Sequence, residues 1–333
     1  MKIYLYLASL VALLCMAAQP AEAQRISVGK KGRVVVMRTD STSAQEIVNQ
    51  DGSRMNRARK TNHLQALAGN LRSDVDIDIP VSKAKQEKTF AVIIANENYQ
   101  EEVNVEFALN DGMAFREYCI KLLGIPESNL HIRKDATLNN MLAEINWMQN
   151  IAKAYGAEAR FIFYYAGHGM PDESNGTSYL LPVDGKSNIL ATGYSMSRLY
   201  AELNGLNAAC VTVLMDACFS GSKRGEGMLA SARGVALKAK AEAPKGNMLV
   251  MTAAQGSETA YPYKEKKHGL FTYFLLKKLQ ESKGKVTYGD LFDYVKTNVA
   301  QKSVVVNEKS QTPTIAVSGD LVSTWQGIRL NED

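Results

Sequence analysis

The stretch FIFYYAGHG, residues 161–169, decides the fold together with a second stretch, VTVLMDACFSG, residues 211–221. Each begins with a near-continuous apolar run and then changes to small and polar residues. Short apolar runs of this kind, bounded by such residues, indicate strands buried on both faces, as in parallel sheets covered by helices. Further strands are predicted at 90–95, 130–133 and 248–252, with a final extended segment at 314–318.

Amphipathic stretches between these runs predict helices at 111–123, 138–155, 196–203, 268–279 and 288–300. Strands that alternate with helices predict an α/β fold, with a mostly parallel sheet flanked by helices on both faces. Two loops are predicted to follow the quoted strands, at 170–185 and 222–246. Because ligands of open α/β sheets bind at the carboxyl ends of the strands, we expect the functional site at that edge.

The composition is that of a folded globular chain. Its 333 residues are 46% hydrophobic and 22% charged, and the net charge is +5. These values exclude a disordered, collagen-like or multi-span membrane protein.

Residues 1–23 resemble a secretory signal peptide. Lys2 precedes an apolar run, 3–18, and Ala21-Glu22-Ala23 forms a small-residue cleavage triplet. We therefore expect an exported protein, periplasmic or extracellular, without a membrane span once the signal is removed. The alternatives are a membrane anchor, for which the run is short, and a lipoprotein modified at Cys15.

A basic polar N-terminal arm or pro-segment is predicted for residues 24–88, which hold thirteen Lys or Arg and seven Asp or Glu. A short strand is expected at 34–37. Because this charge does not form a stripe on a folded face, we expect no nucleic-acid partner. The alternative is a solvated extension without a role. The compact domain then covers 89–320, and 321–333 is a C-terminal tail.

A histidine and a cysteine follow the two quoted strands, as His168 and Cys218. At one sheet edge this pair suits nucleophilic catalysis, because a thiolate attacks and an imidazole exchanges the proton. The backbone amides of Gly169 and Cys218 are candidate donors to an oxyanion. Alone, either residue would more simply be a buried core thiol or a hydrogen-bonded loop histidine. The histidines are scattered and no Cys-x-x-Cys occurs, so a zinc site is not expected.

The hexapeptides YYAGHG, 164–169, and DACFSG, 216–221, resemble the two signatures of caspase-like cysteine peptidases, with the metacaspase type as the nearest branch. The resemblance covers about residues 90–318. It implies the caspase–haemoglobinase fold and a His168/Cys218 dyad that cleaves protein or peptide substrates without a required cofactor. The alternative is a catalytically silent caspase-like module that binds peptides or proteins.

The resemblance also bears on specificity, since metacaspases cut after Arg or Lys using carboxylates. Asp216 lies two residues before the cysteine and projects to the same side of an extended segment, and Asp111 matches the second metacaspase carboxylate. Glu258 is a weaker candidate, and Ala166 replaces a metacaspase serine, which leaves the choice between Arg and Lys open. Asp111 has a simpler alternative role at a helix N-terminus. Cleavage after Asp would need basic residues, for which Arg198 is a weak candidate.

Self-cleavage during activation is a further implication, because relatives can be cut after the cysteine-bearing strand. The candidates in the 222–246 loop are Lys223, Arg224, Arg233 and Lys245. The arm offers a second basic cluster, Arg54, Arg57, Arg59 and Lys60. The alternative for both segments is a solvated, flexible chain.

Calcium is the one metal that the resemblance suggests, since many metacaspases require it. Asp172, Glu173 and Asp184 are candidate ligands because they cluster after His168. EF-hand spacing is absent, and acidic loop residues are commonly just solvated.

Overall fold

The computed structural model describes residues 25–28, 34–37, 72–172, 177–219, 244–256 and 258–331. The chain divides into two compact units, Met1–Gln65 and Ala66–Asp333. In the first, β1 (Arg25–Val28) pairs with β2 (Val34–Met37) in antiparallel fashion. This confirms the strand predicted at 34–37. Residues 72–88, which we assigned to the arm, belong to the second unit.

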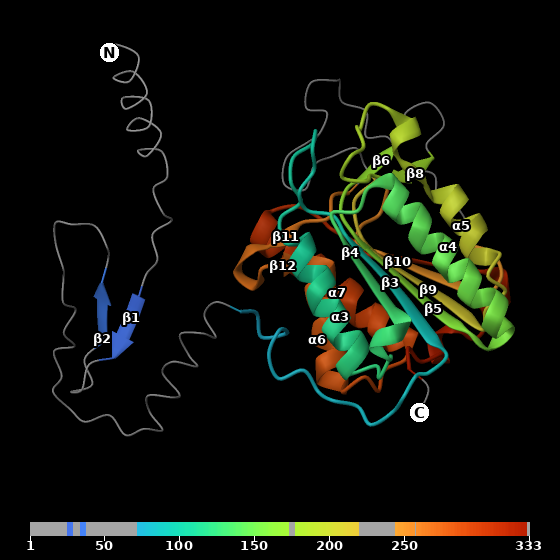
Figure 1. Cartoon of the computed structure of the whole chain (residues 1–333), viewed down its shortest axis with the longest axis horizontal. Coiled ribbons are helices and arrows are strands. Elements are labelled where there is room, and N and C mark those ends of the chain that lie inside the picture. Colours follow the sequence, from blue (N-terminus) through green and yellow to red (C-terminus); the bar gives the residue numbers. More distant parts are fainter. Residues whose placement is uncertain are drawn as a thin grey trace, which may run out of the picture. The chain divides into compact units, whose positions relative to one another are not determined.

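A six-stranded sheet forms the centre of the second unit (Figure 1). Its strand order is β13-β10-β9-β5-β3-β4, and all neighbours are parallel except β13, which runs antiparallel to β10. The strands are β3 (Thr89–Ala95), β4 (Leu130–Lys134), β5 (Arg160–Ala166), β9 (Cys210–Asp216), β10 (Met248–Thr252) and β13 (Thr314–Val317). The predicted mostly parallel sheet is therefore confirmed.

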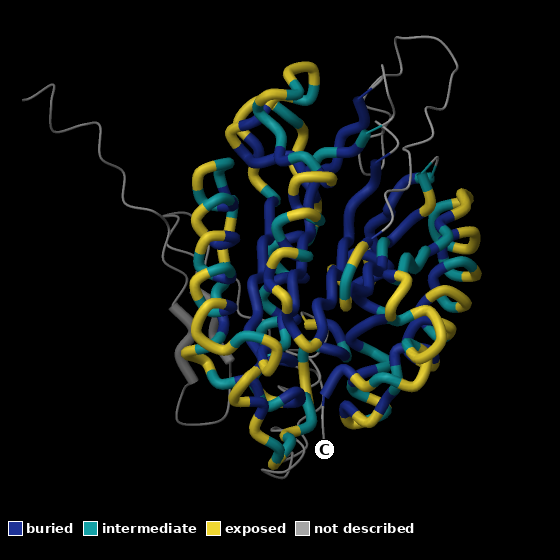
Figure 2. Tube along the Cα trace, turned by 90° about the vertical axis from the view of Figure 1, so that its right-hand side faces the viewer, coloured by how far each residue is buried: buried dark blue, intermediate teal, exposed yellow. Residues whose placement is uncertain are grey.

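Alternate side chains of the central strands enter two separate cores. In β5, for example, Ile162 and Tyr164 belong to one core, whereas Phe163 and Tyr165 belong to the other. This explains the continuous apolar runs, because residues with a period of two point to opposite faces and both faces are covered. The strands are accordingly buried, while the helices keep an exposed side (Figure 2).

Helices cover both faces of the sheet. The first core includes residues of α3 (Ala108–Lys121), α6 (Leu270–Ser282) and α7 (Tyr288–Asn307), and the second includes residues of α4 (Leu138–Tyr155) and α5 (Met196–Asn204). The start of α4 is fixed by a capping box, in which the Thr137 hydroxyl accepts from the Asn140 N–H over 3.2 Å.

The predicted helix at 268–279 begins later than expected. His268 and Gly269 form the short strand β12 (His268–Gly269), which pairs with β11 (Pro262–Tyr263), and α6 starts only at Leu270. A two-residue strand leaves no periodicity in a sequence. Residues 268 and 269 were therefore assigned to the helix that follows them.

The predicted loop at 170–185 also contains most of one short strand and all of a second, which belong to a sheet with a third strand at 194–195. A three-stranded antiparallel sheet is formed by β6 (Gly169–Pro171), β7 (Ser178–Leu180) and β8 (Tyr194–Ser195). These strands are too short for alternation to show. Short 3₁₀ helices complete the described unit: η1 (Glu127–Asn129), η2 (Gly156–Glu158), η3 (Leu190–Thr192), η4 (Lys264–Lys266), η5 (Gly319–Leu321) and η6 (Trp325–Gly327).

Candidate active site

The carboxyl ends of β5 and β9 lie side by side and lead into the two predicted catalytic residues. The strands are in parallel register, with Ala166 opposite Asp216. Gly167 continues the pairing, because its N–H donates to the Asp216 carbonyl over 3.3 Å. His168 and Cys218 therefore each follow the same paired position by two residues. Both are buried, with exposed fractions of 1% and 3%.

The backbone at Gly169 lies directly against the cysteine segment. A Cβ atom added to Gly169 would lie 2.6 Å from the Cys218 carbonyl oxygen and 2.5 Å from a carbon of the Phe219 ring. No side chain fits at these distances, so the glycine allows the histidine and cysteine segments to approach each other. The Gly169 amide, our candidate oxyanion donor, belongs to this close contact.

A set of hydrogen bonds anchors His168. Its Nε2 lies 2.8 Å from the Val103 carbonyl oxygen. Since a carbonyl only accepts, Nε2 carries the proton and Nδ1 is the basic nitrogen of the neutral ring. The His168 N–H donates to the Tyr99 hydroxyl over 2.8 Å, and the Tyr99 ring lies 4.7 Å from the imidazole, centroid to centroid. The Tyr165 hydroxyl donates to the His168 carbonyl over 2.7 Å.

Sequence reasoning did not identify these anchoring residues. Tyr99 and Val103 lie between β3 and α3, far from both signatures in the sequence. Val103 contributes a backbone carbonyl, which any residue type supplies, so no sequence signal could have indicated it. Tyr165 stands inside the first signature, but its apolar neighbours made it look like an ordinary strand residue.

Asp216 is fully buried at the end of β9 and contacts the first turn of α6. Its Oδ2 accepts from the Thr272 N–H over 3.1 Å and from the Thr272 hydroxyl over 2.7 Å. The Thr272 hydroxyl also lies 2.7 Å from the Tyr164 hydroxyl. The carboxylate therefore lies at a helix N-terminus, where the helix dipole favours negative charge.

Asp111 reaches the same helix end from the first turn of α3, where it is fully buried. The Gly269 N–H donates to both carboxylate oxygens of Asp111, with nitrogen-to-oxygen distances of 3.1 Å. The two carboxylates predicted to bind substrate therefore meet at the start of α6, although they are 105 positions apart in the sequence.

His268 is the cationic partner of Asp111. Its Nδ1 lies 2.7 Å from Asp111 Oδ1, and its Nε2 lies 3.0 Å from Asp76 Oδ1. Burial opposes the charged ring, but hydrogen bonds and charge from the two aspartates raise the pKa of His268 to about 9. The imidazole is therefore protonated at neutral pH. Its position within a predicted helix gave no sign of this role.

Comparisons with known proteins show to which family the chain belongs. Residues 88–320 match the family model of the caspase domain. The chain belongs to the caspase domain family. No curated protein sequence matches it. Family membership makes the protein a caspase-like cysteine peptidase in general terms.

Two solved structures are similar to this caspase domain. One is protein GSU0716 from Geobacter sulfurreducens, with 18% identity and a TM-score of 0.54 over 73% of this chain and 98% of that one. The other is caspase-1 from Spodoptera frugiperda, with 15% identity and a TM-score of 0.50 over 74% of this chain and 94% of that one. These similarities confirm the caspase–haemoglobinase fold.

Glu258, the third candidate for substrate binding, connects two segments of the caspase domain. It accepts from the Gln255 side chain over 2.8 Å and from the Thr312 hydroxyl over 3.1 Å. The bond from Thr312 joins the segment after β10 to the segment before β13. The two bonds give Glu258 a structural role, whatever its contact with substrate.

The candidate calcium ligands lie in different settings. Asp172 is buried, and its N–H donates to the Thr177 carbonyl over 2.7 Å. Asp184 is exposed and accepts from the Leu138 N–H over 3.0 Å at the start of α4. Glu173 lies outside the described residues. Within the described ranges, no group of three His, Cys, Asp or Glu side chains could hold a metal ion.

Most of the proposed cleavage sites lie outside the part of the chain that the structure describes. This holds for Lys223, Arg224 and Arg233, as it does for the basic cluster of the arm at 54–60. Lys245 is described and is exposed shortly before β10.

The other two cysteines of the described chain, Cys119 and Cys210, are also buried thiols that form no disulfide. Burial raises the pKa of the Cys119 thiol, which keeps it protonated and unreactive. Cys210 opens β9 at the amino edge of the sheet, opposite the end that leads to Cys218. Position therefore distinguishes Cys218 from both core thiols.

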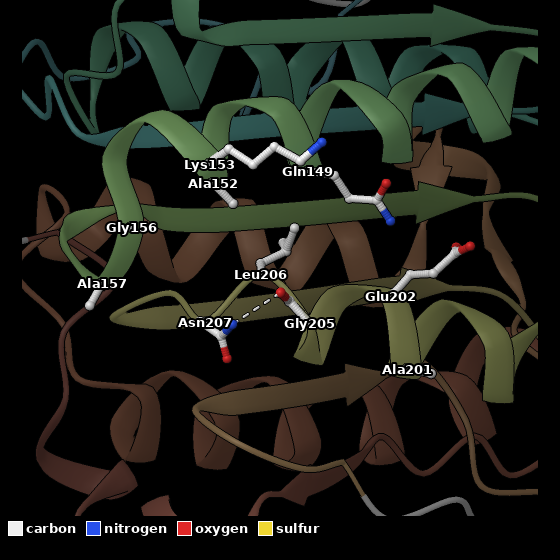
Figure 3. A pocket seen from close by; sticks show the side chains of 10 residues that line it. All are labelled: Gln149, Ala152, Lys153, Gly156, Ala157, Ala201, Glu202, Gly205, Leu206 and Asn207. Carbon is white, nitrogen blue, oxygen red and sulfur yellow. Dashed lines mark hydrogen bonds between the residues drawn. The ribbon is translucent and has the colours of Figure 1, made fainter.

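A cavity of about 590 Å³ lies between α4 and α5 (Figure 3). Gln149 and Lys153 from α4 line it together with Glu202 from α5 and Leu206. These helices end just before the amino ends of β5 and β9, so the cavity lies at the edge opposite His168 and Cys218. We do not assign it to the active site.

In the part of the chain described, no helix is both long and apolar enough to cross a membrane.

Proposed function

We propose that this protein is an endopeptidase with Cys218 as nucleophile and His168 as general base and acid, cutting after Arg or Lys. One observation carries the proposal. His168 and Cys218 follow two paired strands at the same level, and the Gly169 backbone lies against the Cys218 carbonyl. A peptide-binding module has no need of this combination.

The hydrogen bond from His168 Nε2 to the Val103 carbonyl supports the proton transfers. It makes Nδ1 the site that takes the thiol proton from Cys218. The thiolate attacks the scissile carbonyl, and the amides of Gly169 and Cys218 stabilise the oxyanion. His168 then returns the proton to the leaving amine. A water molecule hydrolyses the acyl-enzyme and releases the second product.

The preference for a basic side chain rests on the two carboxylates at the start of α6. Asp216 precedes the nucleophile by two residues, and Asp111 contacts the same helix turn. A site with two carboxylates favours a guanidinium or ammonium and repels an acidic side chain. This is the metacaspase type of specificity. Because Ala166 replaces a serine of metacaspases, the preference between Arg and Lys must be determined by experiment.

Export, self-processing and calcium dependence belong to the same proposal. The apolar N-terminal run supports export to the periplasm or the outside, and the basic residues of the 222–246 loop and the arm suit the proposed specificity. Asp172, Glu173 and Asp184 remain the candidate calcium ligands, although the bond from Leu138 gives Asp184 a role of its own.

Covalent labelling tests the nucleophile and the pocket together. An arginyl chloromethyl ketone should modify Cys218 and spare the core thiol Cys119, as mass spectrometry of the digested protein would show. His168→Ala should abolish the labelling, whereas a matched aspartyl reagent should label weakly. A protein that resists the arginyl reagent would instead be a silent binding module, and faster labelling by the aspartyl reagent would contradict the pocket assignment.

A further inference from the structure

Residues 73–79, here called the strap, lie against α3 and α6. Val75 is fully buried, and the Tyr118 hydroxyl of α3 donates to its carbonyl over 2.8 Å. The Gln280 side chain of α6 donates to the carbonyls of Asp74 and Ile77 over 3.1 and 2.8 Å. The strap is therefore fixed to α3, whose first turn contains Asp111, and to α6, whose first turn contacts Asp216.

Ion pairs hold the strap at Asp74. Lys266 and Lys277 each place Nζ 2.9 Å from one of its oxygens, and the Tyr273 hydroxyl donates to it over 3.2 Å. Burial alone would raise the pKa of Asp74, but the two lysines lower it to about 2. Asp74 is thus charged at every physiological pH, and it forms ion pairs with both lysines.

Asp76 extends this contact into the site. Its carboxylate lies 3.0 Å from His268 Nε2, and the opposite ring nitrogen lies 2.7 Å from Asp111. The Asn110 amide approaches the same Nε2 at 3.3 Å and also donates to the Lys267 carbonyl over 2.7 Å. The ring is fully buried between these groups. A continuous row of charged groups therefore runs from the strap to the specificity carboxylate.

The contact with His268 fixes the orientation of the Asp111 carboxylate. His268 binds Oδ1, so the carboxylate cannot rotate while the imidazole carries its proton. Oδ2 is bonded to the neutral Gly269 amide, a contact that it can share with a guanidinium. Two aspartates around one imidazolium keep a net negative charge, so the cluster still attracts a cation. A carboxylate already held in one orientation loses little entropy on binding.

On the basis of the proposed function, we propose that His268 is a positioning residue that orients Asp111 toward a basic substrate side chain. Through Asp76, this orientation depends on the strap. Specificity for Arg or Lys then requires a segment that lies outside both signatures. Any processing of the arm must also leave the strap in place, and so must cut before residue 73.

Asp76→Asn tests the coupling in the otherwise intact mature protein. Asp78→Asn is the matched control, since Asp78 is exposed on the same strap. With an arginyl fluorogenic peptide, Asp76→Asn should raise KM about tenfold and leave kcat within twofold, because only ground-state positioning is lost. Asp78→Asn should match the wild type. A KM that stays unchanged or falls in Asp76→Asn would overturn the coupling.

The pH dependence of KM separates positioning from a merely structural role. In the wild type, KM should rise above about pH 9 as His268 loses its proton, and in Asp76→Asn this rise should occur at lower pH. A rise at the same pH in both proteins would contradict the role of Asp76.

NMR titration of the His268 ring decides the coupling even if the proposed function fails. If the wild type cleaves no Arg or Lys peptide, the function is refuted, but Asp76→Asn should still lower the His268 titration midpoint by at least about one pH unit. Asp78→Asn should leave it unchanged. Equal midpoints in wild type and Asp76→Asn would refute the coupling itself.

Discussion

Gly169→Ala is expected to disable the enzyme through a contact of less than ordinary van der Waals distance. The new Cβ would lie 2.6 Å from the Cys218 carbonyl oxygen and 2.5 Å from a carbon of the Phe219 ring. Restoring ordinary contacts requires a movement of about 0.8 Å or more. The Phe219 ring can turn, but the carbonyl can move only with the backbone that carries the proposed nucleophile. The perturbation therefore acts on Cys218 directly.

The expected losses follow from this geometry. Overpacking of this kind destabilises a protein by about 1–3 kcal/mol, and a shift of about 1 Å at a reacting group lowers the rate on the order of 100-fold. We predict both effects for Gly169→Ala, measured as kcat/KM on an arginyl peptide and as the free energy of unfolding in urea.

Gly205→Ala is the matched control. Its Cβ would meet backbone oxygens at 3.4 and 3.5 Å, which are ordinary distances, and its φ of −66° suits alanine. Should Gly169→Ala fold poorly, adding Phe219→Leu should restore part of the stability, because it removes the ring contact. The reasoning is refuted if Gly169→Ala equals both Gly205→Ala and wild type in kcat/KM and stability.

Three further outcomes are expected. Asp216→Asn should lower kcat/KM for Arg and Lys peptides at least about tenfold and cost about 1–2 kcal/mol in urea unfolding, because an amide lacks the charge and its oxygen accepts the two Thr272 donors more weakly than a carboxylate does. Asn96→Ala should lower the free energy of unfolding by about 1–3 kcal/mol without changing specificity, since the buried Ala136 N–H loses its acceptor at 2.8 Å. His268, with a pKa raised from 6.5 to about 9, should contribute on the order of 3 kcal/mol below pH 6.5, and this contribution should disappear as the pH rises through 9. Urea unfolding of wild type and His268→Gln across this range would show a difference that narrows with pH, and a constant difference would contradict the assignment.

The elements that periodicity predicts best are those long enough to show a pattern. The helix expected at 138–155 coincides with α4, and the strand expected at 248–252 coincides with β10. Short strands such as β6 and β12 escaped prediction, because two or three residues carry no measurable period.

The site was predictable only where residue type carries the chemistry. His168 and Cys218 could be predicted as a catalytic pair because a histidine and a cysteine follow two apolar strands, which the structure places side by side. The Val103 carbonyl could not, because it is independent of side-chain identity.

The strap shows a second limit. Its polar sequence resembles a solvated arm, yet Val75 is fully buried and Asp74 is paired with two lysines. Those partners lie 192 and 203 positions away in the sequence, beyond the reach of any local pattern.

Hydrolysis of matched fluorogenic peptides ending in Arg, Lys or Asp tests the central claim most directly. The mature protein would be assayed with and without calcium, beside Cys218→Ala and the core-thiol control Cys119→Ala. We predict cleavage after Arg or Lys that is lost in Cys218→Ala and kept in Cys119→Ala. Cleavage after Asp would contradict the pocket assignment. Failure to cleave any of the peptides, even after nicking with trypsin, would contradict the enzymatic function.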